Sequence, residues 1–465
     1  MWVGVPFFRT DRLGAADKEM YLLYNLAIWL ASPILLGWAA VRSLMGRLPG
    51  LADRLGYLPP HLPRGGGPRI WLHAVSLGEM KVAGFLAEQL RDRIPNVQFL
   101  LTASTRTGHD EASRRAATGD MVLYPPLDYA WICRRFLRRY KPEVVVVMET
   151  ELWPNLIREV KRSGATLLLA NGRLSDRSLP RYRFTRCFWR RVLAYPDAFF
   201  VQSAGDAQRF AAIGAPASKI RVSGNLKFAV RASPFALADA LSVSITDAGV
   251  EPVLVAGSTM PGEETVLLQA FLALQAEFPA LWMILAPRHP ERVAGIAAEI
   301  NSASIPYQLR SGWRAGQHIA PGIFLLDSTG ELAGLYGLAR AAFIGGTLVP
   351  TGGHNILEPA HFACPTVIGP SMHNFREIAD QFLEARAVLQ VQDAAELVKA
   401  LRELFRNPEQ AKRLGAAARQ LVESQVSGLD PLLEEIGRRL GSATGTAPAA
   451  AVASHAAAVG AARTK

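Results

Sequence analysis

The run Val144-Val145-Val146-Val147-Met148 ends directly in Glu149-Thr150-Glu151-Leu152-Trp153-Pro154-Asn155. A continuous apolar run of this length, followed by a helical pattern, is typical of a short strand buried on both faces. A carboxylate at the end of such a strand is costly unless it is paired or put to use. The stretch therefore predicts a strand of a parallel sheet with a functional site at its carboxyl end.

Similar apolar runs lie on both sides of this strand, and helical patterns such as 79–93 and 153–163 separate them. In the first half they are residues 70–75, 97–102, 166–170 and 198–201, and in the second half 253–256, 282–286, 323–326, 341–344 and 366–368. Apolar runs joined by helices indicate parallel sheets covered on both faces. We predict an α/β protein with two Rossmann-like domains facing a cleft.

The chain of 465 residues is too long for one ordinary core. We place a first Rossmann-like domain at 43–232 and a second at 233–440. Residues 224–228 and a Pro/Ala-rich stretch at 233–240 are interpreted as the linker between them. From about 441 to 465 the chain is rich in Ala, Gly, Ser and Thr, which predicts a disordered low-complexity tail.

The N-terminal segment, residues 1–42, contains a long run without charge at 20–41. As a helix this run would be about 33 Å long, enough to cross a bilayer core. A secretory signal and a buried helix are the alternatives, but no small-x-small cleavage site is evident. We expect a membrane-anchor helix, with Arg42, Arg47 and Arg54 placing the following domains in the cytoplasm. Met20 is a candidate internal start.

The formal net charge of +11 predicts an anionic partner. Arginines interleaved with aromatic residues cluster at 134–141 and 181–191, a pattern that fits an interfacial surface. A solvated helix face is the alternative for either cluster. No helix-turn-helix, zinc-finger or RNA-binding signature accompanies them, so we expect no nucleic-acid partner. Three widely spaced cysteines exclude a disulfide framework and suit a reducing compartment.

Two further stretches also end apolar runs in small and charged residues. They are Trp71-Leu72-His73-Ala74-Val75-Ser76-Leu77-Gly78-Glu79, and Gly345-Gly346-Thr347 running through Gly352-Gly353-His354-Asn355-Ile356-Leu357-Glu358-Pro359. The glycines of the second suit close approach by a phosphate or sugar. With the stretch at Glu149, in this order and spacing, they resemble the Kdo (3-deoxy-D-manno-octulosonic acid) transferases of lipid A biosynthesis over most of the chain. The resemblance implies a GT-B fold.

Glu79 follows a predicted strand and opens a helix, where a carboxylate is favoured by the helix dipole. A capping role is therefore one interpretation. By resemblance Glu79 is the proton acceptor, which agrees with the need of an attacking hydroxyl for a base within hydrogen-bond reach. Glu149 and Lys227 match residues that stabilise the transition state. Glu151 is interpreted as a cap of the following helix.

The second half carries loops suited to a nucleotide. Residues 257–264 form a glycine-bearing strand-to-helix loop that predicts an anion cradle, without the Gly-Lys-Ser/Thr ending of an NTPase. No Gly-x-Gly-x-x-Gly follows the first strand, which argues against a dinucleotide enzyme. By resemblance, the residues that bind the cytidine monophosphate of the donor are Pro287, Arg288, Ser328, Thr329, Gly330, Asn355 and Glu358.

The resemblance implies transfer of Kdo from CMP-Kdo to the tetra-acylated disaccharide bisphosphate precursor of lipid A (lipid IVA), by an inverting single displacement at the cytoplasmic side of the inner membrane. Lys227 and Arg288 would offset the departing phosphate. No cofactor is expected. No metal is expected either, since the histidines lack the spacing of helical zinc sites and no Asp-x-Asp follows a strand. The alternatives are a glycosyltransferase of the same architecture that uses a UDP-sugar, and a non-catalytic glycolipid-binding assembly protein.

Overall fold

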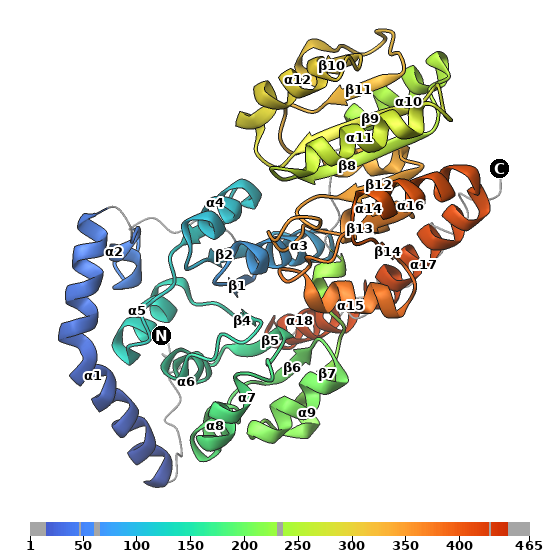
Figure 1. The fold of residues 1–465 in the computed structure, drawn as a ribbon. Coiled ribbons are helices and arrows are strands. Elements are labelled where there is room, and N and C mark those ends of the chain that lie inside the picture. The colour runs from blue at the N-terminus through green and yellow to red at the C-terminus, as the bar shows by residue number, and fades with distance from the viewer. Residues whose placement is uncertain (1–14, 46–47, 60–65, 230–235, 427–428, 445–465) are drawn as a thin grey trace. The chain divides into compact units, whose positions relative to one another are not determined.

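The computed structural model describes residues 15–45, 48–59, 66–229, 236–426 and 429–444. The chain forms two compact units, each with its own sheet (Figure 1). The first unit comprises Met1–Val230 together with Val426–Lys465, and the second comprises Arg231–Gln425. Two Rossmann-like domains with parallel sheets confirm the predicted α/β class.

The first unit contains a seven-stranded parallel sheet in the order β3-β2-β1-β4-β5-β6-β7. Its strands are β1 (Arg69–His73), β2 (Gln98–Thr102), β3 (Met121–Leu123), β4 (Val144–Met148), β5 (Thr166–Gly172), β6 (Ala198–Val201) and β7 (Ile220–Val222). Its helices are α1 (Ala15–Leu44), α2 (Leu51–Arg54), α3 (Leu77–Arg93), α4 (Arg106–Arg115), α5 (Ala130–Tyr140), α6 (Pro154–Arg162), α7 (Leu179–Phe184), α8 (Arg186–Val192), α9 (Ala204–Ile213) and α18 (Leu429–Thr444). The strand order reverses between β1 and β4, so this unit has its topological switch point there.

Successive side chains of the central strands alternate between two apolar cores. Trp71 of β1 packs on one face in a cluster with Phe136 of α5 and Leu156 of α6. Leu72, the next residue, packs on the other face in a cluster with residues of α3 and with Leu432 of α18. Both faces of the sheet are therefore covered, which explains why its strands read as continuous apolar runs.

Helix α18 corrects the predicted domain boundary at residue 440. Instead of closing the second unit, the chain returns to the first one, where Leu432, Leu433 and Ile436 are buried in the core beside β1 and β4. Apolar residues three and four positions apart give α18 the stripe that a core-facing helix needs. An ion pair of 2.8 Å between Arg93 and Asp430 lies at its start. The helix extends to Thr444, and the rest of the predicted tail lies outside the described residues.

The second unit repeats the plan with the strand order β10-β11-β9-β8-β12-β13-β14, again parallel. Its strands are β8 (Val253–Thr259), β9 (Trp282–Pro287), β10 (Tyr307–Leu309), β11 (Gly322–Leu325), β12 (Ala341–Ile344), β13 (Thr366–Ile368) and β14 (Leu389–Gln390). Its helices are α10 (Ala236–Ala248), α11 (Glu263–Gln275), α12 (Val293–Ser302), α13 (Leu332–Leu335), α14 (Leu357–His361), α15 (Arg376–Glu384), α16 (Ala394–Arg406) and α17 (Pro408–Val426). The switch point of this sheet lies between β8 and β12.

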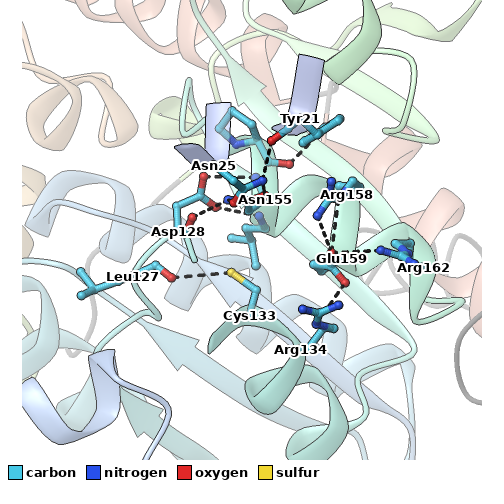
Figure 2. Close-up of polar contacts among 12 residues, drawn as sticks. Tyr21, Asn25, Leu127, Asp128, Cys133, Arg134, Asn155, Arg158, Glu159 and Arg162 are labelled. Atoms are coloured by element: carbon cyan, nitrogen blue, oxygen red, sulfur yellow. Dashed lines mark hydrogen bonds and ion pairs between the residues drawn. The ribbon is translucent and has the colours of Figure 1, made fainter. Parts of the chain in front are cut away.

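Helix α1 covers the run in which we expected a membrane-spanning anchor. In the described part of the chain, however, no helix is both long and apolar enough to cross a membrane. One face of α1 instead packs on the rest of the first unit, where Tyr24 donates to Asp128 at 2.8 Å. Figure 2 shows Asn25 exchanging hydrogen bonds with Asn155. Asp128 is partly buried, and its carboxylate also accepts from the backbone NH groups that begin α6. The polar residues of the run are therefore used to attach it to the protein.

The opposite face of α1 is apolar and exposed. The most exposed large apolar side chains of α1 are Leu22, Leu23, Leu30, Ile34 and Leu44, each at least 66% accessible. Near the start of the helix, Tyr24 contacts the ring of Phe188 in α8, with 5.6 Å between the ring centroids. Helix α1 therefore contacts α8, which carries part of the second arginine cluster.

Candidate functional site

Glu79 lies in the first turn of α3, directly after the carboxyl end of β1. Its carboxylate accepts from the backbone NH of Val75 at 2.9 Å and from the hydroxyl of Ser76 at 2.8 Å, while Ser76 accepts from the NH of Glu79. Ser76 therefore caps α3, and Glu79 reaches back to the NH before the cap, so the interpretation of Glu79 as part of the helix cap is supported. The same contacts hold a carboxylate that is only 8% exposed at the switch point between β1 and β4.

Glu149 lies at the adjacent strand end and has a left-handed backbone with φ of 50°. Its side chain forms an ion pair of 2.8 Å with Lys227. Residues that are not glycine rarely adopt such a φ, and they do so mostly where the surrounding structure fixes them, often at functional sites. The structure therefore brings together Glu149 and Lys227, two predicted site residues that lie far apart in the sequence.

Lys227 lies in a short helical turn, Leu226–Ala229, of the first unit. Residues 224–228 are therefore part of that unit and do not form the predicted linker. Leu226 and Phe228 on either side of Lys227 are buried, and the NH of Leu226 donates to the side chain of Asn171 at 2.9 Å. Residues 233–235 of the predicted linker lie outside the described residues, and 236–240 already belong to α10. Buried neighbours fix the lysine backbone and limit where its ammonium group can reach.

Burial and the surrounding groups change the pKa of Glu79. Burial raises the pKa of Glu79, with a smaller contribution from the negative charge of Glu149, while the hydrogen bonds from Val75 and Ser76 and the charge of Lys227 act in the opposite direction. A general base works best when its pKa lies near the operating pH, and a raised carboxyl pKa moves it that way. The cluster is therefore suited to accept a proton from an attacking hydroxyl.

We predicted that Glu151 caps α6, and the structure contradicts this. The first NH groups of that helix donate to Asp128 instead, and the carboxylate of Glu151 accepts a hydrogen bond of 3.0 Å from the indole of Trp153. Burial, followed by the negative charge of Glu79, raises the pKa of Glu151 to about 7. Glu151 therefore belongs to the same acidic cluster, a role that its sequence position at the helix start concealed.

In the second unit, the predicted nucleotide-binding residues follow neighbouring strands. Pro287 ends β9 and is followed by Arg288, while Ser328, Thr329 and Gly330 come shortly after β11. Asn355 and Glu358 lie at the end of the loop that leaves β12. Carboxyl ends of parallel strands share one edge, and β11 and β12 are three strand spacings apart, or about 14 Å. The residues thus line one edge over a length that suits a nucleotide.

Individual contacts on this edge already order several of these side chains. Asn355 accepts from the NH of Leu357 at 3.2 Å and donates to Glu358, so it holds the first turn of α14. Ser328 donates to Glu331, which in turn pairs with Arg310 at 2.9 Å. Arg288 is exposed at the edge, and its NH donates to the carbonyl of Thr259 at 3.0 Å, joining the loop after β9 to that after β8.

His354 joins this group, although it is not among the residues that the resemblance assigns to the nucleotide. Burial, and then the positive charges of Arg288 and His289, lower the pKa of His354 to about 4. Its buried Nε2 has no hydrogen-bond partner within the described ranges. The imidazole therefore lies near the exposed arginine, with one ring nitrogen that is buried and makes no hydrogen bond to the described residues.

In the first arginine cluster one side chain is used inside the first unit, and lipid contact by the others stays a prediction. On α5, Arg134 approaches the buried Glu159 at 3.9 Å, together with Arg158 and Arg162 (Figure 2). Arg135 stacks over the ring of Tyr57. The second cluster differs, because Arg181, Arg183, Arg186 and Arg190 of α7 and α8 are all exposed. Arg134 is therefore paired inside the first unit, whereas Arg135, Arg138 and Arg139 of α5 are exposed, as are the four arginines of α7 and α8.

Groups of three or more His, Cys, Asp or Glu side chains that could hold a metal ion do not occur among the residues with described positions. The expectation of a metal-independent protein stays a prediction.

The chain is similar in sequence to proteins of known activity. Residues 50–230 match a family model described as 3-deoxy-D-manno-octulosonic-acid transferase (kdotransferase). A 3-deoxy-D-manno-octulosonic acid transferase of Haemophilus influenzae is 33% identical over 422 residues, which cover 88% of this chain and 96% of that protein. Its counterpart in Bordetella pertussis is 32% identical over 435 residues, or 90% of this chain and 99% of the relative.

Solved structures also match. The C-terminal CMP-Kdo binding domain of WaaA from Acinetobacter baumannii is 33% identical and aligns with 41% of this chain and 99% of its own, with a TM-score of 0.38. UDP-GlcNAc 2-epimerase from Neisseria meningitidis aligns with 80% of this chain and 99% of its own, with a TM-score of 0.52 at 12% identity. At that identity the likeness shows the GT-B-like fold alone.

Proposed function

Because this chain belongs to the 3-deoxy-D-manno-octulosonic acid (Kdo) transferase family, we propose that it transfers Kdo from CMP-Kdo to the tetra-acylated disaccharide bisphosphate precursor of lipid A. The observation that carries the proposal is the cluster at the first switch point, where the buried Glu79 lies beside the ion pair of Glu149 and Lys227. The second unit supports it with an edge of polar and cationic side chains sized for a nucleotide.

In the proposed reaction a hydroxyl oxygen of the acceptor forms a bond to the anomeric carbon of Kdo. The bond from that carbon to the phosphate oxygen breaks, and its electron pair leaves with CMP. Glu79 takes the hydroxyl proton, for which its raised pKa and its hydrogen bonds to Val75 and Ser76 prepare it. A single displacement of this kind inverts the anomeric centre. Lys227 and Glu149 supply fixed charges for the transition state.

The test is Glu79→Gln, assayed with the purified protein, CMP-Kdo and the lipid precursor, with the product identified by its mass. Loss of the base should reduce turnover by about 10²- to 10⁴-fold. Thermal stabilisation by CMP should be unchanged, since Glu79 lies in the first unit and the predicted nucleotide residues lie in the second. Turnover near that of the wild type would remove Glu79 as the base. Stabilisation by UDP instead of CMP would point to a UDP-sugar donor.

We also propose that the protein works at the cytoplasmic face of the inner membrane. Support comes from the exposed apolar face of α1 and the exposed arginines of α7 and α8, which adjoin each other through Tyr24 and Phe188. Phe184, 92% exposed between these arginines, adds an apolar side chain to the surface. An apolar and cationic surface of this kind suits a helix that lies on anionic lipid.

A further inference from the structure

The loop that leaves β12 is fastened to a buried carboxylate. Three successive backbone NH groups, those of Gly346, Thr347 and Leu348, donate to Glu263 at 2.6, 3.0 and 3.0 Å. A fourth NH, from Met260, donates to it at 2.9 Å. Glu263 is fully buried, and across the described residues it forms no ion pair. Its charge is therefore balanced by backbone dipoles.

Successive NH groups that converge in this way form the nest that proteins commonly use to bind a phosphate. Gly346 has the left-handed φ of 71° that such a nest needs. Here the nest is filled by the protein's own side chain, and the loop after β8 that we predicted as an anion cradle contributes its Met260 NH to the same carboxylate. These four NH groups are occupied by Glu263, which therefore ties the loop after β12 to the loop after β8.

The position of Gly346 determines the rest of the loop. Its carbonyl accepts from the NH of Gly353 at 2.7 Å and from the hydroxyl of Thr351 at 3.1 Å. An added Cβ at Gly346 would lie 3.1 Å from the ring of His354. Gly346, whose NH donates to Glu263, is thus also bound by the end of the loop, at Thr351 and Gly353. His354, Asn355 and α14 follow immediately.

We propose that Glu263 is a positioning residue of the donor site, which fixes His354, Asn355 and Glu358 by binding the backbone of the loop that carries them. This inference rests on the proposed function, since it concerns how the CMP part of the donor is bound. Glu263 does not touch the ligand. It acts through the backbone by keeping the loop in one conformation before the nucleotide arrives.

Glu263→Gln is the direct test, because an amide of the same shape presents an NH₂ group where the nest needs an acceptor. We expect the Kd for CMP and the KM for CMP-Kdo to rise at least tenfold, while the KM for the lipid precursor stays within twofold. Glu264→Gln is the matched control. Glu264 is adjacent and 2% exposed, but it pairs with Arg292 at 2.8 and 2.9 Å and does not contact the loop.

The control should keep CMP affinity within twofold even if its Tm falls as much as that of Glu263→Gln. Equal losses of CMP affinity in both variants, or none in Glu263→Gln, would overturn the proposal. If Glu263→Gln does not fold, hydrogen exchange of the wild-type protein decides. Amides 346–348 that are protected without CMP support the proposal, and amides protected only after CMP is added refute it.

Failure of the proposed function has a different signature. A wild-type protein that neither binds CMP nor transfers Kdo would overturn the function, whereas hydrogen exchange at 346–348 would still report whether Glu263 holds the loop.

Discussion

Glu149 and Glu151 are separated by one residue, yet their environments differ. The carboxylate of Glu149 pairs with Lys227, whereas that of Glu151 lies near Glu79 with an indole NH as its hydrogen-bond donor. Sequence alone could select Glu149 because it directly follows a buried strand. It could not assign Glu151, because the desolvation that raises its pKa comes from packing around the strand end.

Glu151→Gln should therefore change stability in a way that depends on pH. The pKa of Glu151 in the folded protein, about 7, lies above its ordinary value of 4.5. Folding favours its protonated form, so its contribution to stability falls as pH rises from about 4.5 to about 7 and is then constant. The variant should have the Tm of the wild type near pH 4.5 and exceed it by about 2–4 °C at pH 8, because solvent screening at this partly exposed side chain reduces the effect to about 1 kcal/mol. Calorimetry at both pH values measures this, and an equal difference at both would contradict it.

Among the elements, the buried strands and their helices were predicted well. For example, β4 has the predicted bounds Val144–Met148, and α3 begins two residues before the predicted position. Continuous apolar runs identify such strands because both faces of each sheet are covered. The arginine clusters were harder, since their spacing is compatible with solvent, lipid or an internal partner. Only the structure shows that Arg134 forms an ion pair with Glu159, which is buried on α6.

The four exposed arginines of α7 and α8, which flank the exposed Phe184, should contribute strongly to lipid binding. Replacing Arg181, Arg183, Arg186 and Arg190 with glutamine removes four exposed charges, each worth about 1 kcal/mol near an anionic surface, so affinity for phosphatidylglycerol vesicles should fall by up to about 10³-fold. The loss should be largest at low salt, where screening is weakest. Co-sedimentation measures it.

The matched control replaces four exposed basic residues of α16 and α17, Arg406, Lys412, Arg413 and Arg419, and so changes the net charge equally. It should retain nearly all vesicle binding. Equal losses in both variants would mean that net charge, and not the surface of α7 and α8, governs binding.

For the whole molecule, the stability of the first unit depends on the far end of the chain. Ile436 of α18 is completely buried in the core that contains β1 and β4. Ile436→Ala should lower the free energy of unfolding of the first unit by about 2–5 kcal/mol, because it leaves a cavity in a packed core. Glu434→Ala, at an exposed position of the same helix, is the control and should change it by less than about 0.5 kcal/mol.

Denaturant unfolding followed by hydrogen exchange assigns the loss to a unit. Peptides from β1 and β4 should exchange faster in Ile436→Ala, while the stabilisation of the second unit by CMP stays the same. Faster exchange confined to the second unit would show that α18 belongs there.

The return of α18 also has a consequence for biosynthesis. Nearly two hundred residues of the second unit separate the first sheet from the helix that completes its core. At the usual pace of translation, the ribosome needs on the order of 10–40 s to make that many residues. During this time the nascent first unit exposes the apolar surface that Leu432, Leu433 and Ile436 later cover. The second unit, whose strands and helices are contiguous in the sequence, can complete its fold first, so the half of the protein that is made first is finished last.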